Sequence, residues 1–392
     1  MTVRPLIAAL AGVSVLVAAL LLAVTGRDTW RSAALGLGGE SAAVAPGPRP
    51  VPGHEVFGYV PYWEIDAGIG AHLAATDLTT LALFSVTHTR GGRLDATAPG
   101  FEALTGETGR RLIAEAHDRG VRVELVFTSF GGRRNDRFLR RPAVQERTIQ
   151  ELVELTEGLG ADGVNVDLEQ LDPVRLPAYG AFVGNLEEAL ANADPDASLS
   201  VATTGSEMGA AMAAAAATSG VDRIFLMGYD YHWSGSAPGA SAPLDRRDGS
   251  PKDLVWSLDA YRAVGVPVER TLLGLPLYGM AWPVTGPEIG APRTGNGEAW
   301  IPRSHLDLLS NTDVPATVEP VEAVEHRAVR DGDGWMAIYV DSAATLEQKL
   351  GLANERGLAG AGFWAIGYER GRPDVTELIG AFRDRERPAN GE

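Results

Sequence analysis

Two carboxylates in one short stretch are the clearest chemical feature of the chain. Asn165, Asp167 and Glu169 are separated by single aliphatic residues within segment 161–171. Side chains two residues apart on a β-strand point to the same side, so a strand here would place the three polar groups on one face. The Cα atoms of the two carboxylates would then be roughly 6.6 Å apart. At this spacing the ionised forms repel each other, which raises one pKa and predicts a proton donor near neutral pH.

The segment before this row of polar residues indicates where the polar face points. An amphipathic helical pattern over 149–159 ends at Gly160, and aliphatic residues then alternate with the polar ones. Helix, glycine and strand in this order are typical of β/α repeats, whose parallel strands are covered on both faces. Acidic residues on a strand usually face solvent. In a β/α repeat, however, a polar stripe points into an interior or a cleft.

Short apolar segments and amphipathic helical patterns alternate along the rest of the chain. The predicted strands are 56–62, 80–86, 122–128, 163–169, 199–203, 223–229, 271–278 and 360–366. Helical patterns such as 106–119, 177–191 and 253–264 separate most of them. Eight such units predict an α/β fold, a (β/α)8 or TIM barrel over about residues 53–385, with its site at the carboxyl ends of the strands.

The gap between the seventh and eighth predicted strands is too long for one helix. We expect a small α+β insertion over about 283–340, with a hairpin of 326–330 and 335–340 around the turn Asp331-Gly-Asp-Gly. This turn lacks the third acidic ligand and the distant glutamate of a calcium loop, so a hairpin turn is the favoured interpretation. Residues 386–392 are expected to be a tail.

Composition restricts the class of partner. The 392 residues carry a net charge of −17 and no cysteine. The absence of cysteine excludes thiol nucleophiles, thiolate metal sites and disulfides, and the acidic charge argues against a nucleic-acid surface. A basic cluster is interpreted as a solvated face, with binding of phosphate or an anionic polymer as the alternative. Its members are Arg133, Arg134, Arg137, Arg140 and Arg141.

The N-terminal residues predict export. Arg4 precedes an apolar run from Leu6 to Val24, which as a helix would span roughly 28 Å of hydrocarbon. We expect residues 1–26 to be a signal peptide or a signal-anchor helix, and residues 27–52, rich in alanine, glycine and proline, to be a linker. The folded part would then be extracellular or at the cell surface, anchored in the membrane if the segment is not cleaved.

Aromatic residues gather where this barrel places the carboxyl ends of its strands. They fall in segments 58–63, 227–233, 277–282 and 362–368. Aromatic rings stack on the apolar faces of sugar rings, while carboxylates and tyrosine hydroxyls serve sugar hydroxyl and acetamido groups. A single tryptophan is as often a core residue, but the gathering at four strand ends favours a carbohydrate site.

These residues together resemble glycoside hydrolase family 18, the chitinase-like (β/α)8 enzymes that act on N-acetylglucosamine polymers. The family signature Asp-x-x-Asp-x-Asp-x-Glu is similar to Asp162, Asn165, Asp167 and Glu169, with Asn165 standing where many members have aspartate. The resemblance covers nearly all of residues 54–385.

A second set of motifs narrows the resemblance. The family pattern Met-x-Tyr-Asp is matched by residues 227–230. Segments 229–244 and 274–279 are most similar to the spore-cortex and peptidoglycan N-acetylglucosaminidase branch. The resemblance therefore implies a substrate that contains N-acetylglucosamine, with peptidoglycan, chitin and an N-glycan core left open.

The resemblance implies a retaining, substrate-assisted hydrolysis that needs no cofactor or metal. Glu169 would be the general acid that protonates the glycosidic oxygen and later activates water. Asp167 would orient and stabilise the 2-acetamido group, and Tyr229 would hydrogen-bond the carbonyl oxygen of that group. Trp364 would form the floor of the sugar subsite. The other substrate-binding residues implied are Asn165, Asp162, Asp230, Met227, Tyr59 and Tyr278.

Two other interpretations stay open. Barrels of this kind can lose catalysis and keep the groove, so a carbohydrate-binding protein without activity is the first alternative. Its usual mark would be loss of the acid, and Glu169 is present. A metal-dependent hydrolase using Asp167, Glu169 and Asp162 as oxygen ligands is the second. Metal barrels draw ligands from several strands, often including histidine, and only His232 is near these strand ends.

Overall fold

The computed structural model describes residues 53–387. The predicted signal or anchor segment, the linker and most of the predicted tail fall on residues 1–52 and 388–392, outside the described residues. Within residues 53–387, none of the helices is both long enough and apolar enough to span a bilayer.

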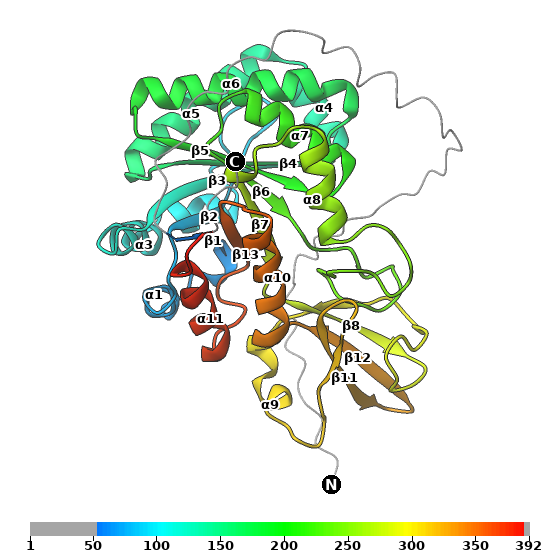
Figure 1. Cartoon of the computed structure of the whole chain (residues 1–392). Helices are drawn as coiled ribbons and strands as arrows, with labels where there is room; N and C mark the ends of the chain where they lie inside the picture. Colours follow the sequence, from blue (N-terminus) through cyan, green and yellow to red (C-terminus); the bar gives the residue numbers. More distant parts are fainter. Residues whose placement is uncertain (1–52, 388–392) are drawn as a thin grey trace. The chain divides into compact units, whose positions relative to one another are not determined.

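Eight parallel strands close into a barrel (Figure 1). They are β1 (Glu55–Pro61), β2 (Thr80–Thr87), β3 (Arg122–Phe130), β4 (Gly163–Glu169), β5 (Ser198–Thr204), β6 (Arg223–Met227), β7 (Thr271–Pro276) and β13 (Gly360–Trp364). Their order around the barrel is β1-β13-β7-β6-β5-β4-β3-β2. The barrel prediction is therefore confirmed, and the predicted bounds of β4 are those observed.

Helices surround the strands in Figure 1 and bury the outer face of the barrel. They are α1 (Ile69–Ala74), α2 (Pro99–Thr105), α3 (Glu107–His117), α4 (Gly132–Leu139), α5 (Pro142–Leu159), α6 (Leu176–Ala193), α7 (Glu207–Thr218), α8 (Leu254–Ala263), α10 (Ala343–Glu355) and α11 (Pro373–Arg383). Gly160 ends α5 with φ of 67°, a left-handed conformation that glycine adopts without strain. This stop lets the chain enter β4 three residues later.

The insertion after β7 forms a separate antiparallel sheet, which lies beside α9 (Leu306–Leu309) and α10 in Figure 1. Its strands are β8 (Gly279–Val284), β9 (Glu298–Trp300), β10 (Thr317–Glu319), β11 (Val324–Asp331) and β12 (Gly334–Val340), in the order β10-β11-β12-β8-β9. The predicted hairpin is confirmed, because Asp331 pairs with Gly334 across the turn. The sheet starts earlier than the predicted boundary at about 283, because β8 follows β7 almost directly.

Three barrel strands end two residues sooner than the sequence predicts. β6 ends at Met227, β7 at Pro276 and β13 at Trp364, because the parallel pairing between them stops there. Tyr229, Asp230 and Tyr278 therefore lie on loops just beyond the strands. Loops at this end of a β/α barrel carry its functional groups, so the early ends place these side chains at the candidate site rather than in the wall.

Candidate active site

The polar row of β4 points into the barrel mouth, while its aliphatic neighbours pack outward against the helices. In register, Asp167 is paired with Thr128 on β3 and Ala202 on β5, and Glu169 is paired with Phe130 at the end of β3. Asp167 is 5% exposed and Glu169 is partly exposed. The row therefore runs from a buried residue to one that reaches the rim.

Burial raises the pKa of both carboxyl groups. Desolvation is the largest cause for Asp167, whose pKa is raised well above its usual value, and the charge of Glu169 adds to it. For Glu169, desolvation and then the charge of Asp230 raise the pKa to about 7. Among the described residues, no hydrogen-bond donor reaches the buried Oδ1 of Asp167. The two groups thus titrate as a pair that holds a proton near neutral pH.

Asn165 belongs to a hydrogen-bond chain below this pair. Tyr59 donates to Asn165 Oδ1 at 3.0 Å, and Asn165 Nδ2 donates to Ser200 Oγ at 2.6 Å. Ser200 in turn donates to Glu124 on β3, and desolvation raises the pKa of this buried carboxyl to about 7. Glu124 is not among the site residues predicted from the sequence. Its signal is a charged residue inside the otherwise apolar stretch 123–127.

Asp230 is fixed by a second set of hydrogen bonds on the loop after β6. Tyr278 donates to its Oδ1, and its backbone N–H donates to Ser241 Oγ at 3.0 Å. Asp230 has φ of 62°, which turns the chain sharply after Tyr229. The residue as a whole is exposed, but its carboxylate is enclosed, and desolvation raises its pKa. The negative charge of Asp230 contributes to the raised pKa of Glu169.

An aromatic group surrounds the carboxylates inside the barrel mouth. Tyr59, Met227, Tyr229 and Trp364 pack in the same inner cluster, which is separate from the core under the helices. The ring of Tyr59 lies 5.6 Å from that of Trp364, centroid to centroid. Trp63, on the loop after β1, is 43% exposed and extends this surface outward. These rings provide the apolar faces on which sugar rings stack.

Asp162 does not join the group. It precedes β4, so the length of the strand separates it from Glu169, and its Oδ2 accepts from Val123 N at 2.7 Å and contacts His117 Nε2 at 2.8 Å. The structure therefore does not bring Asp162 to the group that is expected to bind substrate, because its carboxylate is engaged at the amino end of β4. Within residues 53–387, no three histidine, aspartate or glutamate side chains converge as a set that could hold a metal ion.

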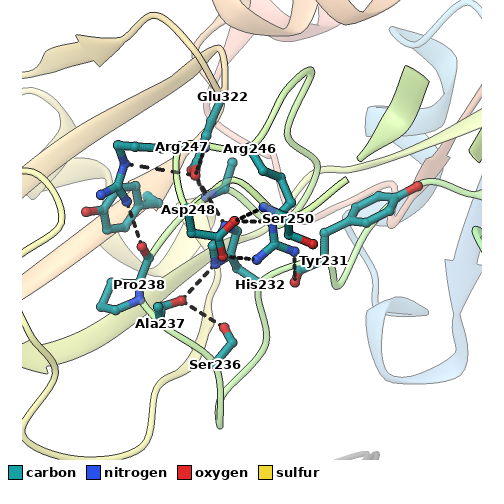
Figure 2. A network of polar contacts seen from close by, with 12 residues as sticks. Tyr231, His232, Ser236, Ala237, Pro238, Arg246, Arg247, Asp248, Ser250 and Glu322 are labelled. Atoms are coloured by element: carbon teal, nitrogen blue, oxygen red, sulfur yellow. Dashed lines mark hydrogen bonds and ion pairs between the residues drawn. The ribbon is translucent and has the colours of Figure 1, made fainter. Parts of the chain in front are cut away.

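A buried ion pair connects the loop after β6 to the insertion (Figure 2). His232 Nε2 lies 3.2 Å from Glu322 Oε1, and both side chains are fully buried. His232 Nδ1 is 2.8 Å from the carbonyl oxygen of Ala237, so both ring nitrogens face acceptors. Glu322 Oε2 also accepts from Ala240 N at 2.7 Å. Glu322 lies between β10 and β11, so the pair fixes the Tyr229–Asp230 loop against the inserted sheet.

Two arginines complete this network in Figure 2. Arg246 Nη1 donates to the carbonyl of Tyr231 at 2.8 Å and pairs with Asp248. Arg247 Nη2 donates to the carbonyl of Pro238 at 2.9 Å, and its Nε lies 4.0 Å from Glu322. The loop after β6 is thus held by charges from its own distal end as well as from the insertion.

The site thus combines three features: it lies in the mouth of a closed β/α barrel, it holds two carboxyl groups with raised pKa values, and aromatic side chains surround it. These features are typical of a site that binds and processes carbohydrate. The family model for glycosyl hydrolases family 18 matches residues 55–369. Because this match covers most of the chain, the chain belongs to glycosyl hydrolases family 18.

Individual relatives are distant. Chitinase 63 of Streptomyces plicatus is 26% identical over 383 residues, which cover 85% of this chain and 61% of the relative. The cortical fragment-lytic enzyme of Bacillus anthracis is 23% identical over 234 residues, which cover 58% of this chain and 52% of that enzyme. The chain thus spans between half and two thirds of the length of these relatives. The second relative agrees with the spore-cortex resemblance of the sequence.

A solved structure has the same fold. The family 18 chitinase from Cycas revoluta in complex with (GlcNAc)3 matches with a TM-score of 0.70 at 19% identity. The match covers 84% of this chain and 99% of that one. At this identity the similarity shows the fold alone.

Proposed function

We propose that this chain hydrolyses β-1,4 linkages at N-acetylglucosamine residues of a peptidoglycan or chitin-type polymer, with retention of configuration. The observation that carries the proposal is the pair on β4: Glu169 has a pKa raised to about 7, and Asp167 beside it has a buried oxygen without a donor. A 2-acetamido group supplies the N–H donor that this oxygen lacks. The names of the relatives, a chitinase and a cortical fragment-lytic enzyme, support the same substrate class.

The first step forms a bond within the substrate. Glu169 gives its proton to the glycosidic oxygen while the carbonyl oxygen of the acetamido group attacks the anomeric carbon, and the bond to the leaving sugar breaks. Asp167 accepts the acetamido N–H and balances the positive charge that develops on the cyclic intermediate. Tyr229 positions the attacking carbonyl, and Trp364 supports the sugar ring.

The second step releases the product. Glu169, now ionised, takes a proton from a water molecule, whose oxygen attacks the anomeric carbon from the side the leaving sugar vacated. The acetamido carbonyl is restored, and Glu169 regains its proton. Two inversions at one carbon give net retention.

The test compares the full chain with Glu169→Gln on purified peptidoglycan and on chitin oligosaccharides, with released ends read by mass spectrometry. We expect new N-acetylglucosamine reducing ends with the wild type, of β configuration by NMR at early times, and none with the variant. Glu157→Gln, an exposed glutamate on α5, is the matched control and should retain activity. Wild-type rates from Glu169→Gln would contradict the proposal. Binding without cleavage would favour the carbohydrate-binding alternative.

We also propose that the apolar run from Leu6 to Val24 directs export of the chain. When this segment is not cleaved, it would anchor the chain at the extracellular face of the membrane. Such placement brings the barrel to a cell-wall polymer. Fractionation of cells that express the full chain, compared with a chain beginning at Pro46, tests this: loss of membrane association in the shorter chain is expected, and equal recovery of both chains in the cytoplasm would contradict it.

A further inference from the structure

An open cleft with a volume of about 700 Å³ begins where Glu169 ends. One wall consists of residues of α4 and its C-cap, among them Arg133 and Arg140, and the other is the segment 170–173 that directly follows Glu169. Neither wall belongs to the group around Asp167 and Trp364. The cleft is therefore a separate surface, whose wall begins at Gln170, the residue after the candidate acid.

The position of this cleft relative to the acid is fixed by direct contacts. Asn135 of α4 is fully buried and donates from Nδ2 to the backbone carbonyl of Glu169. Phe130, the last residue of β3, pairs in register with Glu169 and is 39% exposed. Gly131 follows with φ of 99°, so the chain turns at once from β3 into α4. The first turn of α4 is thus held against the backbone at the end of β4, the strand that carries the acid.

The charged side chains that line the cleft differ in whether they already have a partner within the protein. Asp136 lies between two guanidinium groups, 3.1 Å from Arg140 Nε and 2.8 Å from Arg175 Nε. Asp172 accepts from Val174 N at 3.0 Å and caps the short turn after it. Arg133 is exposed, and in the described part of the chain it makes no hydrogen bond or ion pair. Among the charged side chains of the cleft wall, the one without a partner among residues 53–387 is therefore a cation, and the neutral Gln170 beside it is also exposed.

The role of Glu169 in the proposed reaction indicates which sugar of the substrate would lie in this cleft. If Asp167 and Tyr229 hold the acetamido group of the sugar whose bond breaks, that sugar lies over the barrel centre. The acid protonates the oxygen of the leaving sugar, so the leaving sugar lies on the other side of Glu169, against Arg133 and the 170–173 segment. A chitin unit offers Arg133 only hydroxyl and acetamido groups. A peptidoglycan strand alternates N-acetylglucosamine with a muramic sugar that bears a lactyl carboxylate, or the peptide attached to it.

We infer that Arg133 binds a carboxylate on the leaving sugar and makes an anionic, peptidoglycan-type strand the preferred substrate over neutral chitin. This inference rests on the proposed function, because it places the leaving sugar by the role of Glu169. Guanidinium groups pair with carboxylates through two parallel hydrogen bonds, and a pair at an exposed rim is weakened by salt. In a chain of net charge −17, an exposed arginine in this cleft, without an ion-pair partner among the described residues, also attracts an anionic polymer.

The test measures kcat/KM of the full chain on three substrates: intact peptidoglycan strands, strands stripped of peptide by an amidase, and an N-acetylglucosamine hexamer. The variants are Arg133→Gln and Arg133→Lys. The matched control is Arg137→Gln, an exposed arginine on the same helix that is not in the cleft wall. We expect Arg133→Gln to lose about tenfold on the anionic strands, and less than twofold on the hexamer, as for one exposed charge-assisted contact. Arg133→Lys should keep part of the preference, and high salt should reduce it.

The outcomes separate this inference from the proposed function. An undiminished rate of Arg133→Gln on anionic strands, or an equal loss on the hexamer, would overturn the inference while activity on the hexamer keeps the function. A wild type that cleaves none of the three overturns both. A loss confined to stripped strands supports the lactyl carboxylate, which is set free when the amidase removes the peptide, and a loss confined to intact strands supports the peptide carboxylates. A loss on both substrates means that Arg133 binds either carboxylate. A loss in Arg137→Gln as large as in Arg133→Gln would assign the effect to the general field of α4 and overturn the role of Arg133.

Discussion

Asp167 in the barrel and Glu322 in the insertion are both buried carboxylates, and their pKa values move in opposite directions. Asp167 is 5% exposed, and its pKa is raised, chiefly by desolvation. Glu322 is fully buried, yet its pKa is lowered, because hydrogen bonds and charge from His232 outweigh desolvation. The opposite pKa shifts therefore come from the hydrogen-bond and charge partners of each carboxylate, because both groups are buried.

This comparison separates functional from structural carboxylates. Glu322 accepts from a backbone N–H and lies beside His232 and Arg247. Its carboxylate oxygens therefore have little capacity left to accept a hydrogen bond from a ligand. Asp167 keeps a buried oxygen without a donor next to Glu169, whose own pKa is about 7. Carboxyl groups that are buried at the barrel mouth without hydrogen-bond donors or positive charges beside them are the ones that can exchange protons with a substrate.

The largest expected effect is on catalysis. Asp167→Asn should lower kcat by about 10²- to 10³-fold, the usual loss when one group that stabilises the transition state is removed. Steady-state kinetics on N-acetylglucosamine oligosaccharides measure it. Asp162→Asn, at the other end of the same strand, is the control and should keep its kcat once folded. A comparable loss in Asp162→Asn would show that the two ends of β4 do not differ in function.

The next effect is on stability. Glu322→Gln should lower the free energy of unfolding by about 3 kcal/mol at pH 7, because it removes the buried carboxylate that His232, Arg247 and the Ala240 N–H surround. A lowered folded-state pKa means that the stabilisation is present above the unfolded value of about 4.5 and is lost as the pH falls through the folded value. Urea unfolding at pH 7 and pH 3 should therefore show a deficit that shrinks in acid.

An exposed ion pair provides the contrast for that measurement. Glu207 lies 3.5 Å from Lys252, and both side chains are more than half exposed. Glu207→Gln should change the free energy of unfolding by less than about 1 kcal/mol at either pH. A Glu322→Gln variant as stable as this control would mean that the connection between the loop after β6 and the insertion contributes nothing.

Replacing Glu124 should have a smaller effect on stability, and the variant should be more stable than the wild type rather than less. Its pKa is raised to about 7, so the folded state holds its proton more tightly, and stability falls as the pH rises from the unfolded value of 4.5 toward 7. Glu124→Gln, which stays neutral, should match the wild type at pH 4 and be more stable by roughly 1 kcal/mol or more at pH 8. Thermal unfolding at both pH values measures the difference. A variant less stable than the wild type at pH 8 would contradict it.

The smallest effect is a displaced pH profile. With the pKa of Glu169 at about 7, kcat/KM should fall about tenfold per pH unit on the alkaline side as the acid loses its proton. The charge of Asp230 contributes to that raised pKa, so Asp230→Asn should move the alkaline limb to lower pH. An unmoved limb would remove Asp230 from the electrostatics of the acid, whatever the change in rate.

Local patterns in the sequence are sufficient for the scaffold and the central row. The alternation through 163–169 predicts both the strand and its polar face, since strand side chains repeat every two residues. The repeated order of strand and helix predicts the barrel, and the long gap before the last strand predicts the insertion. Strand ends were less predictable: β6 and β7 stop where pairing with their neighbours stops, which no single segment encodes.

The sequence by itself determined that Asp167 and Glu169 share a strand face, with aromatic side chains at neighbouring strand ends. Only the tertiary structure decided which carboxylates find partners. Asp162 and Asp167 are the same residue type on one β/α unit, yet Asp162 is satisfied by Val123, 39 residues away in sequence, and Asp167 is left short of a donor. Likewise, Glu322 meets His232 only because the insertion folds back onto the loop after β6. A pKa depends on the groups that surround a carboxyl in space, and the fold brings those groups from distant parts of the chain.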